Sequence, residues 1–359
     1  MKRSFLDFNL LAFQELMGLW GEPRYRGKQI CHRIYQQFIN NPHEIGNLPH
    51  KLRERLSNEL DWTLPKLVER LDSKDGSTKL LLATNRGQIF ETVVMRYENR
   101  TSLCVSSQVG CKLACDFCQT GKLGFFAHLS KSLILAQVLI ANRLLVQEKR
   151  KVTHIVFMGM GEPLDNYQNC IDAANWMMDP DGFHLSWRHV TISTSGLAPA
   201  ISRFAEECKA SLAVSLHAAC NELRSKLMPI NKKFPLARLK QEMVSYQSRT
   251  GKLITIEYIL IKDVNCSIGA AKLLVKFVHG LRVKVNLIPF NAHPGLPYQS
   301  PLPETIRAFQ RYLGVRSIPS PVRYSKGQDV SAACGQLAAK SQQRLDLAPE
   351  RKMVLTEIG

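Results

Sequence analysis

The chain has 359 residues, of which 45% are hydrophobic and 22% are charged, and its formal net charge at pH 7 is +18. This composition is typical of a globular protein and argues against intrinsic disorder. No apolar run reaches the roughly 18 residues that a membrane span requires, and no secretion signal follows Met1. We therefore expect a cytoplasmic protein without membrane contact, whose cysteines are reduced and free for metal binding or catalysis.

The excess of positive charge favours a polyanionic partner such as a nucleic acid. One basic run without an acid comprises Arg24, Arg26, Lys28, His32 and Arg33. A run of this kind either follows a phosphate backbone or forms a solvated helix face, and the sequence leaves both interpretations open. A second basic cluster comprises Arg224, Lys226, Lys232, Lys233, Arg238 and Lys240.

The order of predicted elements divides the chain into four parts. Short helices broken by turn residues predict a basic helical accessory domain at 1–60. Residues 61–96 alternate with a period of two and predict a β-hairpin linker. Residues 97–329 form the predicted core domain, and residues 330–359 form a C-terminal segment with a polar tail.

Within the core domain, strand-like and helix-like stretches alternate. The predicted strands are 153–158, 189–194, 212–216, 254–260 and 283–288, and the predicted helices are 129–147, 166–178, 198–207, 236–249, 268–279 and 304–313. This order predicts an α/β fold with parallel strands, in an open sheet or a barrel. Ligands of such folds bind at the carboxyl ends of the strands, where we expect the functional residues.

The strongest motif is the CxxxCxxC run formed by Cys111, Cys115 and Cys118. Three thiolates within eight residues can hold one metal centre, but they cannot complete a four-thiolate site. On a four-iron cluster they leave one iron open for another ligand, which favours chemistry over simple electron transfer. A structural zinc site is the alternative interpretation.

The motif and its neighbours resemble the RlmN/Cfr-type adenine methyltransferases, which belong to the radical S-adenosylmethionine (SAM) superfamily. The resemblance covers about residues 25–337. It is carried by CxxxCxFC together with LCVSSQVG at 103–110, TGKLGF at 120–125, MGMGEP at 158–163, STSG at 193–196, SLH at 215–217, KLMPIN at 226–231 and AACGQL at 332–337. It implies a partial (β/α)6 TIM-like radical SAM barrel, a [4Fe-4S] cluster on Cys111, Cys115 and Cys118, and methylation of RNA adenine.

The family's reaction demands further cysteines, because the target carbon of adenine is electron-poor and cannot attack the methyl group of SAM directly. By resemblance, Cys334 carries the methyl group as S-methylcysteine, and Cys104 later releases the product by forming a transient disulfide. Glu91 matches the family's proton acceptor. A second SAM supplies a 5′-deoxyadenosyl radical. Buried thiols and a solvated carboxylate are the alternative interpretations of these three residues.

The resemblance also implies the cofactor residues and partners. The SAM-binding positions are Gly161, Glu162, Ser193, Ser215, Leu216, His217 and Asn291. The implied substrates are 23S rRNA and tRNA, methylated at C2 of adenine, and the implied electron donor is a flavodoxin or ferredoxin. We expect a monomer. Two alternatives stay open: a C8-directed methyltransferase of the antibiotic-resistance type, against which Pro163 argues, and a non-catalytic RNA-binding iron–sulfur or zinc protein.

Overall fold

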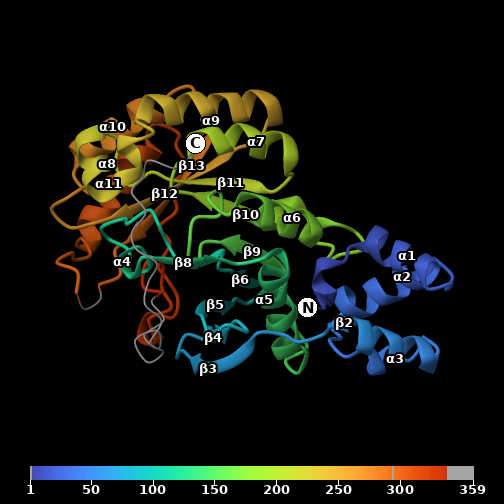
Figure 1. Cartoon of the computed structure of the whole chain (residues 1–359). Coiled ribbons are helices and arrows are strands. Elements are labelled where there is room, and N and C mark those ends of the chain that lie inside the picture. Colours follow the sequence, from blue (N-terminus) through green and yellow to red (C-terminus); the bar gives the residue numbers. More distant parts are fainter. Residues whose placement is uncertain (1, 293–294, 338–359) are drawn as a thin grey trace.

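The computed structural model describes residues 2–292 and 295–337 and is built around one large curved sheet (Figure 1). Its nine strands lie in the order β13-β12-β11-β10-β9-β6-β5-β4-β3. The parallel strands are β6 (Thr101–Cys104), β9 (His154–Phe157), β10 (Val190–Thr194), β11 (Ser211–Ser215), β12 (Ile254–Leu260) and β13 (Val283–Pro289).

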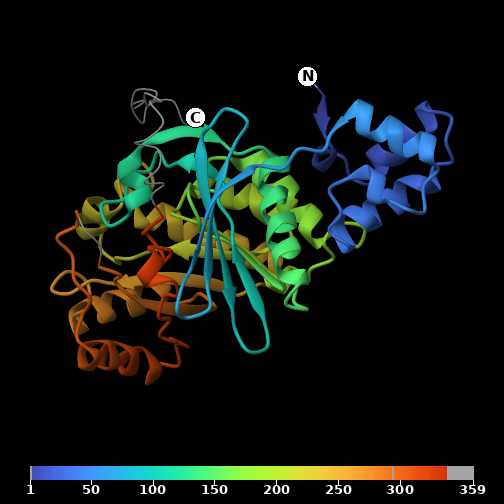
Figure 2. The same cartoon turned by 90° about the horizontal axis from the view of Figure 1, so that it is seen from below.

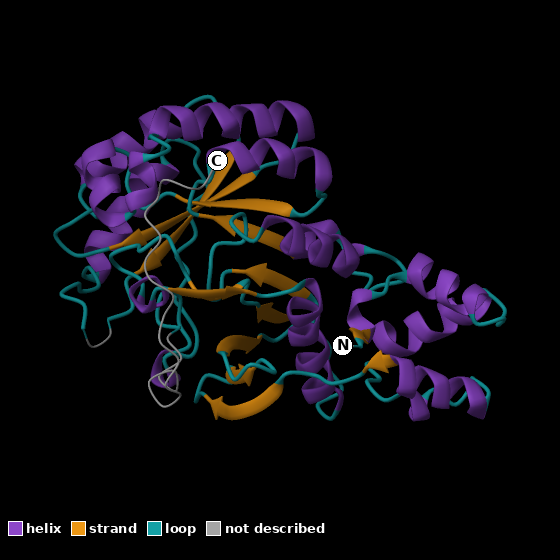
Figure 3. Ribbon diagram, viewed as in Figure 1, coloured by secondary structure: helices purple, strands orange, loops and turns teal. Residues whose placement is uncertain are grey.

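The helices that connect these strands lie on the outer side of the sheet (Figure 3). They are α5 (Lys131–Val146), α6 (Tyr167–Met178), α7 (Ala198–Glu207), α8 (Asn221–Leu227), α9 (Leu236–Thr250) and α10 (Ile268–Val278). Helix α11 (Pro303–Gly314) follows the last strand, β13. The predicted α/β fold, a partial (β/α)6 barrel, is thereby confirmed. Among the described residues, no helix is both long and apolar enough to cross a membrane.

Local sequence explains where these elements begin and end. Ser130 caps α5 by accepting a hydrogen bond from the backbone N–H of Leu133 at 3.3 Å, and Gly251 ends α9 in the left-handed conformation, with φ +65°. Strand β12 is buried along its whole length and lies between β11 and β13, as is typical of an inner strand of a parallel sheet.

The predicted β linker forms part of the main sheet. Strands β3 (Lys66–Asp72), β4 (Thr78–Ala83) and β5 (Ile89–Arg96) pair antiparallel with one another, and β5 pairs antiparallel with β6, so that Val93 lies opposite Cys104. The long hairpins are visible from below in Figure 2. The sequence did not reveal this continuity because pairing between distant strands leaves no local signal.

The N-terminal helices form a lobe beside the barrel (Figure 2). The lobe contains β1 (Arg3–Ser4), η1 (Phe5–Asp7), α1 (Leu10–Leu19), α2 (Tyr25–Cys31), η2 (His32–Gln36), η3 (Pro42–Glu44), α3 (His50–Glu59) and β2 (Leu60–Asp61). The ring of Tyr35 packs edge-on against Trp176 of α6 at 5.2 Å. Of the predicted basic run, Arg24, Lys28 and His32 are exposed.

A segment at residues 319–337, here called the closing segment, connects the two ends of the sheet. It begins beside β13, where Pro319 O accepts the N–H of Val285 at 2.8 Å. It then reaches the β3–β4 turn, where Asp75 accepts the N–H of Gly327 at 2.7 Å and Asp329 accepts the hydroxyl of Ser73 at 2.5 Å. It includes η6 (Gln328–Val330). Of the predicted 330–359 segment, residues 338–359 lie outside the described residues.

Candidate active site

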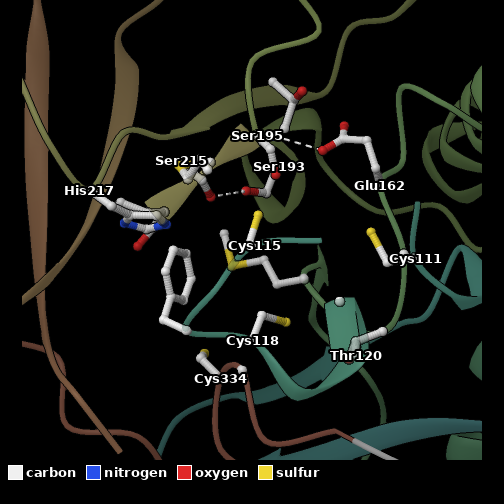
Figure 4. A pocket seen from close by; sticks show the side chains of 18 of the residues that line it. Cys111, Cys115, Cys118, Thr120, Glu162, Ser193, Ser195, Ser215, His217 and Cys334 are labelled. Carbon is white, nitrogen blue, oxygen red and sulfur yellow. Dashed lines mark hydrogen bonds between the residues drawn. The ribbon is translucent and has the colours of Figure 1, made fainter. Parts of the chain in front are cut away.

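A pocket lies at the carboxyl ends of the parallel strands (Figure 4). Gly161 and Glu162 reach it from the loop after β9, Ser193 from β10, and Ser215 and His217 from the end of β11. The three motif cysteines and Cys334 line the same pocket: Cys111, Cys115, Cys118 and Cys334. Segments far apart in the sequence therefore bring the predicted cluster ligands, most of the predicted SAM residues and the predicted methyl carrier to one place.

A tight hairpin holds the loop that carries the motif cysteines. Strand β7 (Gln108–Gly110) pairs antiparallel with β8 (Phe125–His128), and Cys111 N–H donates to Gly124 O at 2.8 Å. Gly110 has φ +76°, and a Cβ there would lie 1.9 Å from Gly124 O. Only glycine therefore fits at this position. The loop continues into the short helix α4 (Gln119–Leu123).

The three thiols fit an iron–sulfur cluster. They are spaced around the pocket in Figure 4, and in the described residues no group of three or more His, Cys, Asp or Glu could hold a single metal ion. Burial raises the pKa of all three thiols, and neighbouring cysteines raise the pKa of Cys111 and Cys115 further. Three buried thiolates that repel one another require compensating cations, which the irons of a cluster supply.

Glu162 is a buried carboxyl group that the backbone holds at two strand ends. One carboxylate oxygen accepts the N–H of Ser195 at 2.7 Å, and the other accepts the N–H of Leu164 at 3.1 Å. Burial raises the pKa of Glu162 to about 7. Next to it, Gly161 has φ +100° and packs against Gln108, where a Cβ would meet side-chain carbon at 2.5 Å. A carboxylate held in one position by backbone hydrogen bonds is suited to bind the ammonium group of SAM.

The opposite wall of the pocket is formed by polar side chains with fixed orientations. The hydroxyls of Ser193 and Ser215 lie 3.5 Å apart. His217 Nδ1 accepts the N–H of Ile259 at 3.1 Å, and burial lowers the pKa of the imidazole to about 3. The ring is therefore neutral, with its proton on Nε2, and it packs edge-on against Phe117 at 4.8 Å.

Two predicted SAM residues lie outside the pocket lining. Leu216 is fully buried, and its backbone N–H donates to Glu257 O at 3.0 Å. Asn291 is also buried, and its amide donates to the hydroxyl of Ser325 at 2.8 Å. The structure therefore gives Leu216 a backbone role at the end of β11 and ties Asn291 to the closing segment.

A second pocket adjoins the first and contains both predicted catalytic cysteines, Cys104 of β6 and Cys334 of the closing segment. Cys334 lines both pockets and is an exposed residue. Burial raises the pKa of the Cys104 thiol, and the proximity of Cys334 raises it further. Both cysteines therefore line one pocket.

Hydrogen bonds to the cluster loop hold the Cys334 turn in place. Gln119 N–H donates to Gly335 O at 2.8 Å, and the hydroxyl of Thr120 donates to Leu337 O at 2.6 Å. Because Gln119 follows Cys118 directly, the turn that carries Cys334 is fixed to the loop that carries the cluster ligands.

Glu91 lies on the inner face of β5 but outside both pockets. Strand alternation places it on the same face as Val93 and Met95, which line the second pocket with Cys104. Its side chain is 1% exposed, and Lys79 Nζ lies 3.7 Å from its carboxylate and also donates to Ser331 O at 3.2 Å. Burial raises the pKa of Glu91 to about 7, and Lys79 opposes this increase.

Sequence reasoning misassigned Arg224 and missed Glu257. Arg224, which the sequence places in the second basic cluster, is 0% exposed and therefore cannot contact RNA phosphates. Its guanidinium donates to the carbonyls of Ser195, Ser215 and Leu216 and to the side chain of Asn231. The carbonyls that end β10 and β11 require donors, and Arg224 supplies them. Glu257 lies in the middle of the apolar strand β12 and belongs to no recognised motif. The one indication in the sequence is that an acidic residue interrupts a run of apolar residues.

Comparisons with known proteins agree with this geometry. Residues 105–263 match the model of the radical SAM superfamily, and residues 4–61 match that of the ribosomal RNA large subunit methyltransferase N-terminal domain. The chain is 42% identical to the dual-specificity RNA methyltransferase RlmN of Anaeromyxobacter sp. (strain Fw109-5), over 91% of this chain and 88% of the relative. It is 43% identical to the RlmN of a Nitratiruptor species, over 89% of this chain and 94% of the relative.

Solved structures include a radical SAM methyltransferase from Sphaerobacter thermophilus, with a TM-score of 0.90 and 41% identity over 94% of this chain and 100% of that one. The fold and the three-cysteine pocket thus define a radical SAM enzyme, which uses a [4Fe-4S] cluster and SAM. Within that class, the chain belongs to the RlmN family of methyltransferases.

Proposed function

We propose that this enzyme methylates C2 of an adenine in 23S rRNA and in tRNA through a methyl group carried on Cys334. The observation that carries the proposal is that Cys104 and Cys334 line one pocket, which adjoins the pocket of the motif cysteines. A covalent methyl relay requires both cysteines, whereas an RNA-binding protein without catalysis requires neither. The names of the RlmN relatives support RNA as the substrate.

Different residues of the protein bind the cluster, orient SAM and transfer the methyl group. Cys111, Cys115 and Cys118 would hold the cluster, and Glu162, Ser193, Ser215 and His217 would orient SAM, with Gly161, Leu216 and Asn291 shaping the surrounding backbone. The bound cluster and SAM supply the radical chemistry that activates the methyl group on Cys334. Cys334 is the nucleophile that accepts the methyl group and then joins it to the adenine. Glu91 accepts the ring proton, and Cys104 attacks the Cys334 sulfur to release the methylated RNA as a disulfide forms.

The partners follow from the substrate. A base inside a helix cannot reach this pocket, so we propose that the RNA presents an unstacked adenine. The exposed basic residues of the N-terminal lobe would contact phosphates and position the RNA. We further propose that the enzyme acts as a monomer in the cytoplasm and receives electrons from a flavodoxin or ferredoxin.

The test is anaerobic reconstitution with iron and sulfide, followed by reaction with SAM, a reductant and either rRNA or tRNA. We expect 5′-deoxyadenosine in the solution and 2-methyladenosine in the digested RNA, both identified by mass spectrometry. Absence of 5′-deoxyadenosine from protein with an intact cluster would refute the enzyme assignment. Formation of 8-methyladenosine would instead support the C8-directed alternative.

A further inference from the structure

Glu257 lies at the boundary between the two pockets and lines both of them. It is located in β12, is 4% exposed, and accepts a hydrogen bond from the Asn286 side chain at 2.8 Å. Glu257 is not among the site residues expected from the sequence, and the proposed reaction assigns it no role. Because an acid this deeply buried is costly to ionise, its presence calls for a physical role.

The surroundings of Glu257 connect it to the methyl-carrying cysteine. Cys334 also lines both pockets, and the charge of Glu257 raises the pKa of its thiol. Arg323, which lines the second pocket, acts in the opposite direction on both groups: it lowers the pKa of Glu257 and that of Cys334. The first pocket also holds the titratable groups of the three motif cysteines, Glu162 and His217. The second pocket also holds Cys104 of β6, Tyr97, and Tyr324 and Lys326 of the closing segment, and Lys284 on β13 lowers the pKa of Glu257.

We propose that Glu257 is the base that accepts the proton of the Cys334 thiol when Cys334 takes up its methyl group. This inference rests on the proposed function, since it assigns a proton acceptor to the first step of that reaction. The thiolate is a far better nucleophile than the thiol, and desolvation together with the charge of Glu257 raises the pKa of the Cys334 thiol, which opposes its spontaneous ionisation. A carboxylate that borders the same two pockets provides a local destination for the proton.

The step is balanced in atoms and charge. The S–H bond of Cys334 breaks, its proton passes to the carboxylate of Glu257, and the electron pair stays on sulfur. The sulfur forms a bond to the methyl carbon of SAM as the carbon–sulfonium bond breaks, and that electron pair remains on the departing S-adenosylhomocysteine. No electrons are gained or lost, and the proton on Glu257 leaves to solvent. Burial raises the pKa of Glu257, which reduces the mismatch with the thiol.

The first experiment measures S-methylation of Cys334 in the reconstituted full chain. SAM with a CD3 group is supplied across a range of pH, and labelled Cys334 is quantified by peptide mass spectrometry. Glu257→Gln keeps the shape and an acceptor for Asn286 but removes the base. We expect methylation about 10²-fold slower at pH 7, with the defect shrinking as pH rises, because hydroxide then ionises the thiol. A purely structural defect would slow the reaction equally at every pH.

A second readout does not depend on catalysis. Without SAM, the alkylation of Cys334 by iodoacetamide is followed against pH in the wild type and in Glu257→Gln. Iodoacetamide reacts with the thiolate, so loss of the proton acceptor should slow alkylation of Cys334 at and below pH 7. At higher pH, where the charge of Glu257 disfavours the thiolate in the wild type, Glu257→Gln should react as fast as the wild type or faster. The matched control is Glu242→Gln, which removes a buried acid of α9 that pairs with Arg238 at 2.6 Å and lies outside both pockets. It should leave both profiles unchanged.

The outcomes separate this inference from the proposed function. Wild-type protein that never labels Cys334 contradicts the methyl-carrier function itself. A wild type that labels Cys334, with Glu257→Gln equal to it or slowed equally at all pH values, overturns the role of Glu257 alone.

Discussion

Cys104, at the end of strand β6, and Cys334, in the closing segment, line the same pocket although most of the barrel separates them in sequence. Strand pairing fixes Cys104, which lies opposite Val93 of β5. Cys334 instead sits on a turn that hydrogen bonds attach to the cluster loop. One thiol is thus part of the sheet, and the other belongs to a segment that hydrogen bonds to distant parts of the chain hold in place.

Replacing Cys104 by alanine should trap the reaction. Without the resolving thiol, the RNA stays attached to Cys334, and we expect an RNase-sensitive protein–RNA species on a denaturing gel, with methylated product reduced by at least about 10²-fold. Cys266→Ala removes a buried thiol outside both pockets and serves as the control. A Cys104→Ala enzyme that turns over without any adduct would contradict its resolving role.

The Cys334→Ala variant should lose RNA methylation completely and keep its cluster. The motif cysteines are intact, so iron content and the visible absorption of the cluster should match the wild type. The adduct seen with Cys104→Ala should also vanish in the double variant Cys104→Ala/Cys334→Ala. Residual RNA methylation by Cys334→Ala would refute its assignment as the methyl carrier.

Turnover limited by Glu91 should depend on pH in a definite direction. The carboxylate must be ionised to accept a proton, so the rate should rise as pH increases through the raised pKa of about 7. Lys79 lowers this pKa, and Lys79→Met should therefore shift the midpoint upward by about one unit. The measurement is the rate of 2-methyladenosine formation against pH.

Lys79 also donates a hydrogen bond to Ser331 of the closing segment, so the control variant must remove a hydrogen bond of that segment and leave the Glu91–Lys79 pair intact. Lys326→Met does so, because Lys326 Nζ donates to the carbonyls of Asp75 and Arg96, each at 2.9 Å. The variant should keep the midpoint of the wild type. A midpoint shifted equally by both substitutions would show that the position of the segment, rather than the charge on Lys79, sets the profile.

Gly110→Ala should prevent cluster assembly, whereas Gly87→Ala should not. Both glycines have φ +76°, so each substitution incurs about 1–2 kcal/mol for the left-handed backbone. The Cβ at position 87 meets nothing within 4 Å, but the Cβ at position 110 would lie 1.9 Å from Gly124 O and force the β7–β8 hairpin open. Iron per chain after reconstitution is the measurement, and equal iron content in the two variants would disprove the steric argument.

Local pattern was sufficient to predict the parallel core of the fold. The stretch 254–260 is uniformly apolar apart from Glu257 and Thr255 and forms β12 with the predicted bounds, and the predicted helix 198–207 is α7. These elements are predictable because the periodicity of side chains and the capping residues act over a few neighbouring positions. The cluster motif is equally local, since its three ligands lie within one short loop.

Contacts between segments that are distant in sequence could be known only from the tertiary structure. The sequence by itself determined the alternating α/β order, the three-cysteine loop and the presence of two further cysteines suited to a methyl relay. Only the folded chain joins β3–β5 to the barrel, places Cys334 beside Cys104, and buries Arg224 and Glu257. The physical reason is that burial, ion pairing and hydrogen bonding across the sheet depend on contacts between residues that no local periodicity relates.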